Sequence, residues 1–249
     1  MKYLLILLLF VLNIYADDTK QKITIGLGPY IQTQPYKDVA AIFVLSPVIF
    51  FDNSLFYIRW SRFGMYFLGS KGKEFSWGLS LTAQPRTFGY ESSDSSTVIG
   101  MDERENSFEG GVAFSASYND AYLEIMALSD VLSRHDTWLL KAELGDEYNL
   151  GDFTFYPSAI LTYQSDEFVN YYYGVKAEEA ARTSYGVYTP KGGLQIGVQT
   201  FINYDINDKF SVLANLRADQ IPQSAKNSPL IDESTIYSGL LSLIYTFEY

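Results

Sequence analysis

The sequence predicts an all-β protein, a transmembrane antiparallel up-and-down β-barrel with both termini on the periplasmic side. The clearest indication is the carboxyl-terminal segment, which carries Leu241, Leu243, Tyr245, Phe247 and Tyr249 at every second position. Successive side chains of a strand point to opposite faces, so a strand between lipid and a polar lumen must alternate in this way. The 21 Tyr and 17 Phe residues agree with this fold, because aromatic girdles flank barrel walls at the membrane interfaces.

The amino terminus has the features of a secretion signal. Lys2 precedes an apolar run from Tyr3 to Leu12, and Ala16 is a suitable cleavage residue before Asp17. A membrane anchor is the alternative, but the run falls short of the roughly 20 residues that a spanning helix needs. We therefore predict a cleaved signal peptide over residues 1–16 and one outer-membrane barrel domain over residues 17–249.

Composition excludes several other classes of protein. The chain has no cysteine, so it cannot be a lipoprotein and can form neither a disulfide nor a thiolate metal site. With 18 basic and 29 acidic residues it lacks the basic surface that nucleic acid requires. The expected partners are instead the lipid bilayer, lipopolysaccharide and, through the carboxyl-terminal strand, the barrel-assembly machinery.

Reading backward from the carboxyl terminus gives twelve alternating segments that are separated mostly by short turns on one side and longer connections on the other. The region between Ser61 and Gly69 decides the count, because it holds either a short strand of its own or an extension of the strand before it. Bacterial single-chain barrels have an even number of strands, so we predict twelve, with ten as the alternative. The predicted strands are 22–29, 41–51, 55–60, 63–68, 75–83, 108–118, 121–129, 138–148, 153–165, 194–199, 210–217 and 237–249.

The polar face of these strands carries charges of both signs, on Arg59, Glu124, Lys141, Glu143 and Arg217. One interpretation is that they pair with one another and fill a narrow interior, which offsets their desolvation. The other is a selective pore with fixed charges. The first is favoured because a barrel of twelve strands leaves little space inside once side chains are in place.

An enzymatic function is not predicted. The single histidine, His135, lies near Ser133 and Asp136 in a short loop. A nucleophile, a base and an orienting group must meet in space, and neighbours in a polar loop tip give no indication that they do.

No cofactor and no metal site are predicted either. The acidic pairs Asp102-Glu103 and Glu178-Glu179 are interpreted as solvated loop charge, because acid/base chemistry needs environments that separate two pKa values. Gly26 and Gly28 lie in an alternating strand without the helix that follows a phosphate-binding loop.

One long segment resembles a known family. Its run of Tyr173, Gly174 and Val175, followed by Ala180, Tyr188, Pro190 and Gly192, is similar to the signature loop of the MipA/OmpV family, the MltA-interacting protein family of outer-membrane proteins. The segments 128–131 and 228–230 agree with the same family, so the resemblance covers nearly the whole mature chain.

The resemblance implies an outer-membrane protein of a Gram-negative bacterium that acts as a non-enzymatic scaffold in the cell envelope. Such a scaffold would link a lytic transglycosylase, which is a murein hydrolase, to a murein synthase and so serve peptidoglycan growth. Family members of other kinds imply two alternatives, a porin-like channel for small solutes and a surface adhesin. The short periplasmic turns argue against the scaffold role, because they offer little contact area and specific interfaces usually bury about 800 Å² per partner.

Overall fold

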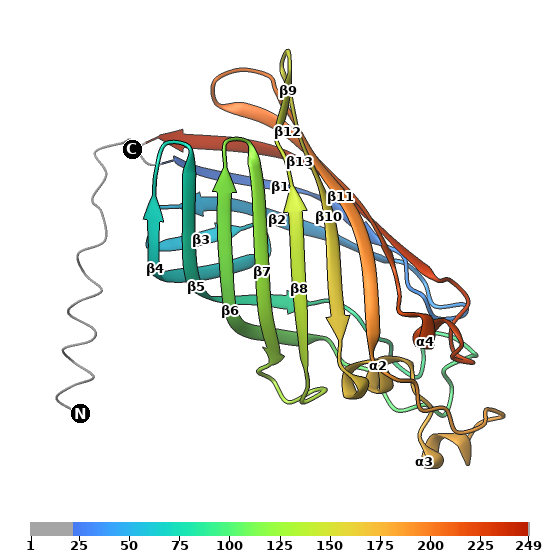
Figure 1. Ribbon diagram of the computed structural model, residues 1–249. Helices are drawn as coiled ribbons and strands as arrows, with labels where there is room; N and C mark the ends of the chain where they lie inside the picture. The colour runs from blue at the N-terminus through green and yellow to red at the C-terminus, as the bar shows by residue number, and fades with distance from the viewer. Residues whose placement is uncertain (1–21, 249) are drawn as a thin grey trace.

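The computed structural model describes residues 22–248, and their strands form one antiparallel sheet that closes into a barrel (Figure 1). Each strand pairs with its neighbours in the chain, except that β8 and β9 both pair with β10, and β1 pairs with β13 to close the ring. The predicted signal peptide over residues 1–16 lies outside the described residues, as does Tyr249. The strands are β1 (Lys22–Gln32), β2 (Ile42–Asp52), β3 (Phe56–Arg59), β4 (Arg62–Lys71), β5 (Phe75–Arg86), β6 (Ser107–Tyr118), β7 (Ala121–Asp130), β8 (Trp138–Gly145), β9 (Tyr148–Leu150), β10 (Phe153–Gln164), β11 (Gly193–Asp205), β12 (Phe210–Gln220) and β13 (Thr235–Glu248).

The wall has twelve strand positions, which confirms the predicted number. β8 and β9 both pair with β10, one after the other, so they occupy a single position that is interrupted at Asp146 and Glu147. The predicted continuous strand 138–148 is therefore wrong at this break. Several strands are also longer than predicted, and β11 continues to Asp205, pairing with β10 as far as Tyr204 and with β12 as far as Asp205. Alternation is lost in that extension because Phe201, on the lumen face, is apolar like its lipid-facing neighbour Ile202 and packs against the apolar side of the lumen.

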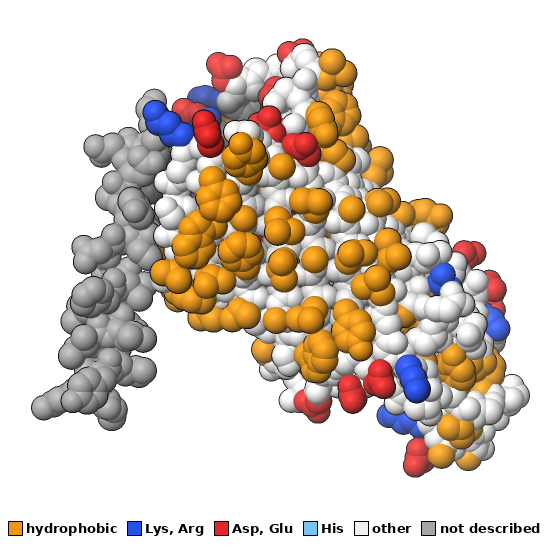
Figure 2. Space-filling view, in the orientation of Figure 1, with side chains coloured by type: hydrophobic (Ala, Val, Ile, Leu, Met, Phe, Trp, Pro, Cys, Tyr) orange, Lys and Arg blue, Asp and Glu red, His pale blue; other side chains and the backbone are white. Residues whose placement is uncertain are grey.

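The outer face of the wall is apolar and the inner face is largely polar. Figure 2 shows hydrophobic side chains in a belt across the strands, with acidic and basic side chains gathered toward the two ends. On β13, Leu241, Leu243 and Phe247 are about half exposed while Ser242 between them is buried in the lumen. This is the arrangement that a strand between hydrocarbon and a lumen requires.

The two ends of the barrel differ. At one end, here called the turn end, Lys22 lies opposite Glu248 and the connections 53–55, 72–74, 119–120, 151–152 and 206–209 are short. At the other, the loop end, lie the connections 33–41, 60–61, 87–106, 131–137, 165–192 and 221–234. The loop end also carries the helices α2 (Asp166–Tyr173), α3 (Ala177–Ala180) and α4 (Gln223–Lys226). Among residues 22–248 no helix is long and apolar enough to cross a membrane.

One hairpin leaves the wall low on one side. β3 has only four residues and pairs with β2 only at Phe50, Phe51 and Asp52. The chain then turns at Trp60 and Ser61 into β4. Trp60 has a φ of 57°, in the left-handed region that a bulky residue seldom adopts. The wall on this side therefore stops well short of the loop end.

Candidate functional site

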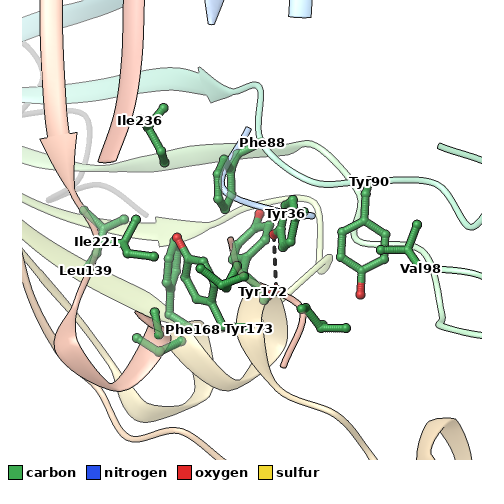
Figure 3. Packing of buried hydrophobic residues seen from close by; sticks show 14 of the residues in the cluster. Tyr36, Phe88, Tyr90, Val98, Leu139, Phe168, Tyr172, Tyr173, Ile221 and Ile236 are labelled. Carbon is green, nitrogen blue, oxygen red and sulfur yellow. Dashed lines mark hydrogen bonds between the residues drawn. The ribbon is translucent and has the colours of Figure 1, made fainter. Parts of the chain in front are cut away.

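The longer connections fold inward over the loop end and close it; together we call segments 33–41, 87–106, 131–137, 165–192 and 221–234 the loop cap. Their aromatic side chains come together in one buried cluster (Figure 3). The Tyr36 hydroxyl donates to the main-chain oxygen of Tyr172 at 3.1 Å, and the Tyr36 and Tyr90 rings meet edge to face at 4.7 Å. The largest rings of the cluster are those of Tyr36, Phe88, Tyr90, Phe168, Tyr172 and Tyr173. Such packing makes the cap a hydrophobic core of its own rather than a set of solvated loops.

Helix α2 supplies one side of that core. Its first turn is capped by Ser165, whose hydroxyl accepts from the Phe168 N–H, and Asp166 and Glu167 lie where the helix dipole favours acids. The buried face carries Phe168, Val169, Tyr172 and Tyr173. The sequence thus defines a short amphipathic helix that packs under the mouth of the barrel.

The signature segment predicted from the sequence belongs to this cap. Tyr173 and Val175 are buried, and Val175 forms a β-bridge with Tyr188. The Gly192 N–H donates to the Asp166 carboxylate at 2.7 Å and so joins the two ends of the connection 165–192. Ala180 ends α3, and Pro190 lies between the bridge and β11. These residues shape the cap, and their role in the family's activity stays a prediction.

A buried ion pair holds two of the cap segments together. Arg104 from segment 87–106 donates to Glu179 of α3 at 2.7 Å, and the side chains are 1% and 0% exposed. The guanidinium lies 5.6 Å from the ring centroids of both Tyr90 and Tyr171. Burial alone would lower the pKa of Arg104, but Tyr90 and Glu179 raise it above its usual value, so the side chain stays charged. Arg104 was not among the predicted site residues, although it is the one cation among the acidic residues 102–105.

The interpretation of these acidic pairs as solvated loop charge is wrong for Glu179. Its carboxylate also accepts the main-chain N–H groups of Asp102 at 3.1 Å and Lys176 at 2.7 Å. Asp102 is only partly buried, yet it pairs with Lys176 at 3.1 Å and Arg182 at 2.6 Å. Glu179 is buried rather than solvated because the tertiary fold brings it next to Arg104. Within residues 22–248, His, Asp and Glu form no group that could hold a metal ion.

His135 lies inside the cap rather than at a solvated tip. Its ring meets Phe168, Tyr171 and Tyr172 at 5.1, 6.0 and 5.7 Å, and neither ring nitrogen has a hydrogen-bond partner. Burial lowers the pKa of His135, and Asp130, 4.0 Å away, only partly opposes that effect. The predicted polar loop tip is therefore wrong for His135, because the packing of α2 against the loop was not visible in the sequence.

Below the cap the lumen is a cavity of about 1170 Å³. It extends to the turn-end residues Asn53, Ser54 and Asp205 and is therefore accessible from that end, while the cap covers the opposite one. Its lining has two unlike sides. One is an apolar cluster from β1, β2, β11–β13 and the turn between β3 and β4 that includes Phe50, Trp60, Phe201, Leu213 and Ile244. The other carries ion pairs.

The predicted lumen charges do pair. Glu124 bridges Arg59, at 2.8 Å, and Arg62, an additional cation that the sequence analysis had not singled out. Lys141 pairs with Glu143 at 3.1 Å, and Arg217 pairs with Asp219 at 2.5 Å. The prediction that the charges neutralise one another is confirmed, but they do not fill the interior. The loop cap closes the loop end of the barrel, and the lumen below it is hollow.

Comparison with known proteins identifies the class and the family. A closed twelve-strand barrel with an apolar outer belt is an outer membrane β-barrel protein, and the related proteins are outer membrane proteins of Gram-negative bacteria. Residues 25–247 match the family model described as MltA-interacting protein MipA, and the chain belongs to that family.

Several relatives cover most of the chain. The outer membrane protein YiaT of Escherichia coli K12 is 24% identical over 97% of this chain and 98% of its own. The MltA-interacting protein of Escherichia coli K12 is 25% identical over 92% and 90%, and OmpV of Vibrio cholerae is 24% identical over 73% and 69%. Among solved structures, an outer membrane channel from Pseudomonas putida F1 matches 95% of this chain and 98% of its own, with 10% identity and a TM-score of 0.47.

The outer-membrane location determines which end of the barrel faces the periplasm. In outer-membrane barrels the short turns face the periplasm and the longer loops face outward. The cavity is therefore accessible from the periplasm, and the loop cap covers it on the cell exterior.

Proposed function

We propose that this protein is a non-enzymatic scaffold that holds a lytic transglycosylase, and through it a murein synthase, at the inner face of the outer membrane. The observation that carries the proposal is the closed cap above a cavity that is open to the periplasm. The accessible side of the barrel therefore faces the compartment that contains murein. The family description, which names an interaction with MltA, supports the same partner. Binding to lipopolysaccharide and delivery by the barrel-assembly machinery belong to the proposal as well.

The hairpin of β9 and β10 is the best candidate for the docking element. The Glu147 N–H donates to the Asp120 oxygen at 3.2 Å, and beyond that point β9 pairs with β10 alone. Tyr148 and Leu150 of β9 are 57% and 71% exposed. An apolar hairpin with a free strand edge, beside the mouth of a cavity, offers more contact area than the short turns alone. The hairpin thereby adds contact area toward the roughly 800 Å² per partner that a specific interface usually buries.

The absence of catalysis is part of the proposal. The candidate base, His135, faces three aromatic rings, and its ring nitrogens make no hydrogen bond. Ser133 and Asp136 are exposed in the same loop. A nucleophile and its base must lie within hydrogen-bond reach, so this arrangement favours a binding protein.

The test is a pull-down with the detergent-folded barrel as bait, comparing the wild type with a Tyr148→Ala, Leu150→Ala variant. The matched control is Phe75→Ala, Tyr118→Ala, a facing pair of similar exposure at another turn. We expect the wild type and the control to retain a lytic transglycosylase and the hairpin variant to lose it. Failure of the folded wild type to retain any murein enzyme would refute the scaffold.

Two other functions have some support. A cavity of about 1170 Å³ with paired charges favours a small-solute channel that conducts when the cap opens, and discrete single-channel currents would reveal it. The exposed cap residues Ile99, Val131, Leu132 and Val187 favour a surface adhesin. Substituting them with serine should then abolish adhesion while the barrel still folds.

A further inference from the structure

The low hairpin of β3 and β4 leaves part of the barrel wall unpaired. Among the described residues, β2 has no strand partner on its β3 side from Ile42 to Val48, a length of about 23 Å at 3.3 Å per residue. On β5, residues 84–86 likewise extend past the last residue paired with β4. The two free edges face each other across the Trp60–Ser61 turn. We call this space the lateral aperture.

The aperture has an upper limit as well as a lower one. Toward the loop end, the Gln32 side chain donates to the Thr87 oxygen at 3.1 Å, and the Gln34 side chain donates to the Gly89 oxygen at 3.4 Å. These bonds join the end of β1 and the segment after it to the segment after β5. The aperture is therefore a bounded window in the outer half of the wall.

Proline lies on both edges of this window, at a position that prevents pairing. The Trp60 N–H donates to the Ile49 oxygen, so the main-chain polar groups of Ile49 face the β3 side. Alternate residues of an antiparallel strand share that direction, which aims the nitrogen of Pro47 into the aperture. On β5, the Phe75 oxygen accepts from Gly72 on the β4 side, and the same alternation aims the nitrogen of Pro85 into the aperture.

A proline nitrogen has no hydrogen to donate. At these two positions the free edges consequently leave no N–H group unsatisfied, which would be costly in hydrocarbon. The same prolines weaken any strand that would add to either edge, because a ladder bond is missing. At Pro47 and Pro85 the edges are therefore suited to face lipid and poorly suited to pair with a peptide.

The lining of the aperture is apolar on both faces of β2. Phe43 and Leu45 on the lipid side are 72% and 64% exposed. Val44 belongs to the lumen face, as does Val48, yet Val44 is 46% exposed and Val48 is 0% exposed. An enclosed lumen would have covered Val44, so its exposure shows where the wall is open.

Behind the aperture lies the apolar side of the lumen. The Trp60 indole nitrogen donates to the Ser46 hydroxyl at 3.0 Å, and its ring meets Tyr30 at 5.5 Å and Phe201 at 6.2 Å. These contacts hold Trp60 in its strained backbone conformation against the lumen face of β2. A path lined by apolar side chains thus runs from the lipid face at Leu45 to the aromatic rings inside.

We propose that the lateral aperture admits an acyl chain of a membrane lipid from the outer leaflet into the lumen, where it packs against Val44 and Trp60. The occupant is hydrocarbon because the β2 edge and the wall behind it are apolar, because Gln84 and Arg86 on the β5 edge are engaged by Glu109, and because the prolines disfavour an added strand. Lipid is also the molecule that surrounds this part of the wall. The inference is independent of the scaffold role.

Trp60 is a natural reporter of this occupant. The chain has three tryptophans, so Trp77→Phe with Trp138→Phe leaves Trp60 alone. This variant is folded into phosphatidylcholine vesicles with plain or brominated acyl chains, since bromine quenches indole fluorescence at short range. A variant that keeps only Trp138, which is 46% exposed on the lipid face, is the positive control. We expect brominated chains to quench both tryptophans.

A variant that closes the aperture distinguishes quenching by an acyl chain that has entered the lumen from quenching by lipid outside the wall. Val44→Phe fills the space beside Trp60, and it should restore Trp60 emission in brominated vesicles. Leu161→Phe, at a lipid-facing residue of β10 that is 45% exposed, is the matched control and should leave quenching unchanged. Heat-modifiable migration in gels verifies that each variant is folded.

Three results would overturn the proposal. The first is unquenched Trp60 emission in brominated vesicles when the Trp138 control is quenched. The second is quenching of Trp60 that Val44→Phe does not reduce in a folded barrel. The third is a dimer in light scattering that Val44→Phe dissociates, because a second copy would then cover the edge.

Discussion

Replacing Glu179 by glutamine should open the loop cap without damaging the barrel wall. In the wild type the Glu179 carboxylate accepts from Arg104 at 2.7 Å and from the main-chain N–H groups of Asp102 and Lys176. Glu179→Gln keeps the size and shape of the side chain but removes its negative charge. Arg104, 1% exposed, then becomes a buried charge without a counterion.

The magnitude follows from the burial of this pair. Removing one partner of a buried ion pair costs about 3–5 kcal/mol. The pair joins segments 87–106 and 165–192, which belong to the cap, so the cost falls on cap opening rather than on the strand ladder. Since each 1.4 kcal/mol is a factor of ten, the open population should rise roughly 100- to 4,000-fold.

Hydrogen exchange measures that population directly. We expect amides of residues 168–180 to lose protection in Glu179→Gln by the same factor, while β10 and β11 keep theirs. Planar-bilayer recordings should also show more frequent conducting events, because the cap closes the lumen on the exterior. The matched control is Glu178→Gln, the exposed neighbour on α3, which should change neither measurement.

Wild-type protection of the cap in folded Glu179→Gln would refute this reasoning. It would mean that the aromatic cluster alone holds the cap closed and that the ion pair contributes little. A loss of protection spread equally over the wall strands would refute it in another way, because the cap would then not open as a separate unit.

Three further predictions concern other parts of the molecule. Burial lowers the pKa of His135, so the cap should be fully stable above the unfolded value of about 6.5 and lose stability as pH falls below it; thermal unfolding of His135→Phe should show less of this dependence. Glu124→Gln leaves Arg59 and Arg62 without their shared carboxylate and should cost about 3 kcal/mol in denaturant unfolding, and an unchanged midpoint would contradict this. Deleting Tyr249 should reduce the fraction of heat-modifiable barrel in cell envelopes, and normal assembly would count against the terminal aromatic as an assembly signal.

The sequence by itself determined the wall. Alternation at Leu241, Leu243 and Phe247 states which face each side chain takes, because a strand has a period of two whatever its neighbours are. The alternating short and long connections followed from the same local pattern, and the even strand count followed from the rule that bacterial single-chain barrels have an even number of strands. The lumen position of Glu124 and Glu143 followed from the local pattern as well, and pairing with cations offsets the desolvation of such charges.

The tertiary structure alone decided what happens at the loop end. Arg104 and Glu179 are 75 residues apart, and no local period relates them. His135 was predicted at a solvated loop tip, but α2 packs over it. Pro47 and Pro85 lie on facing edges only because β3 and β4 are short. Strand faces are encoded by adjacent residues, whereas loop contacts depend on how the closed barrel brings distant segments together, and the sequence pattern carries no direct record of that closure.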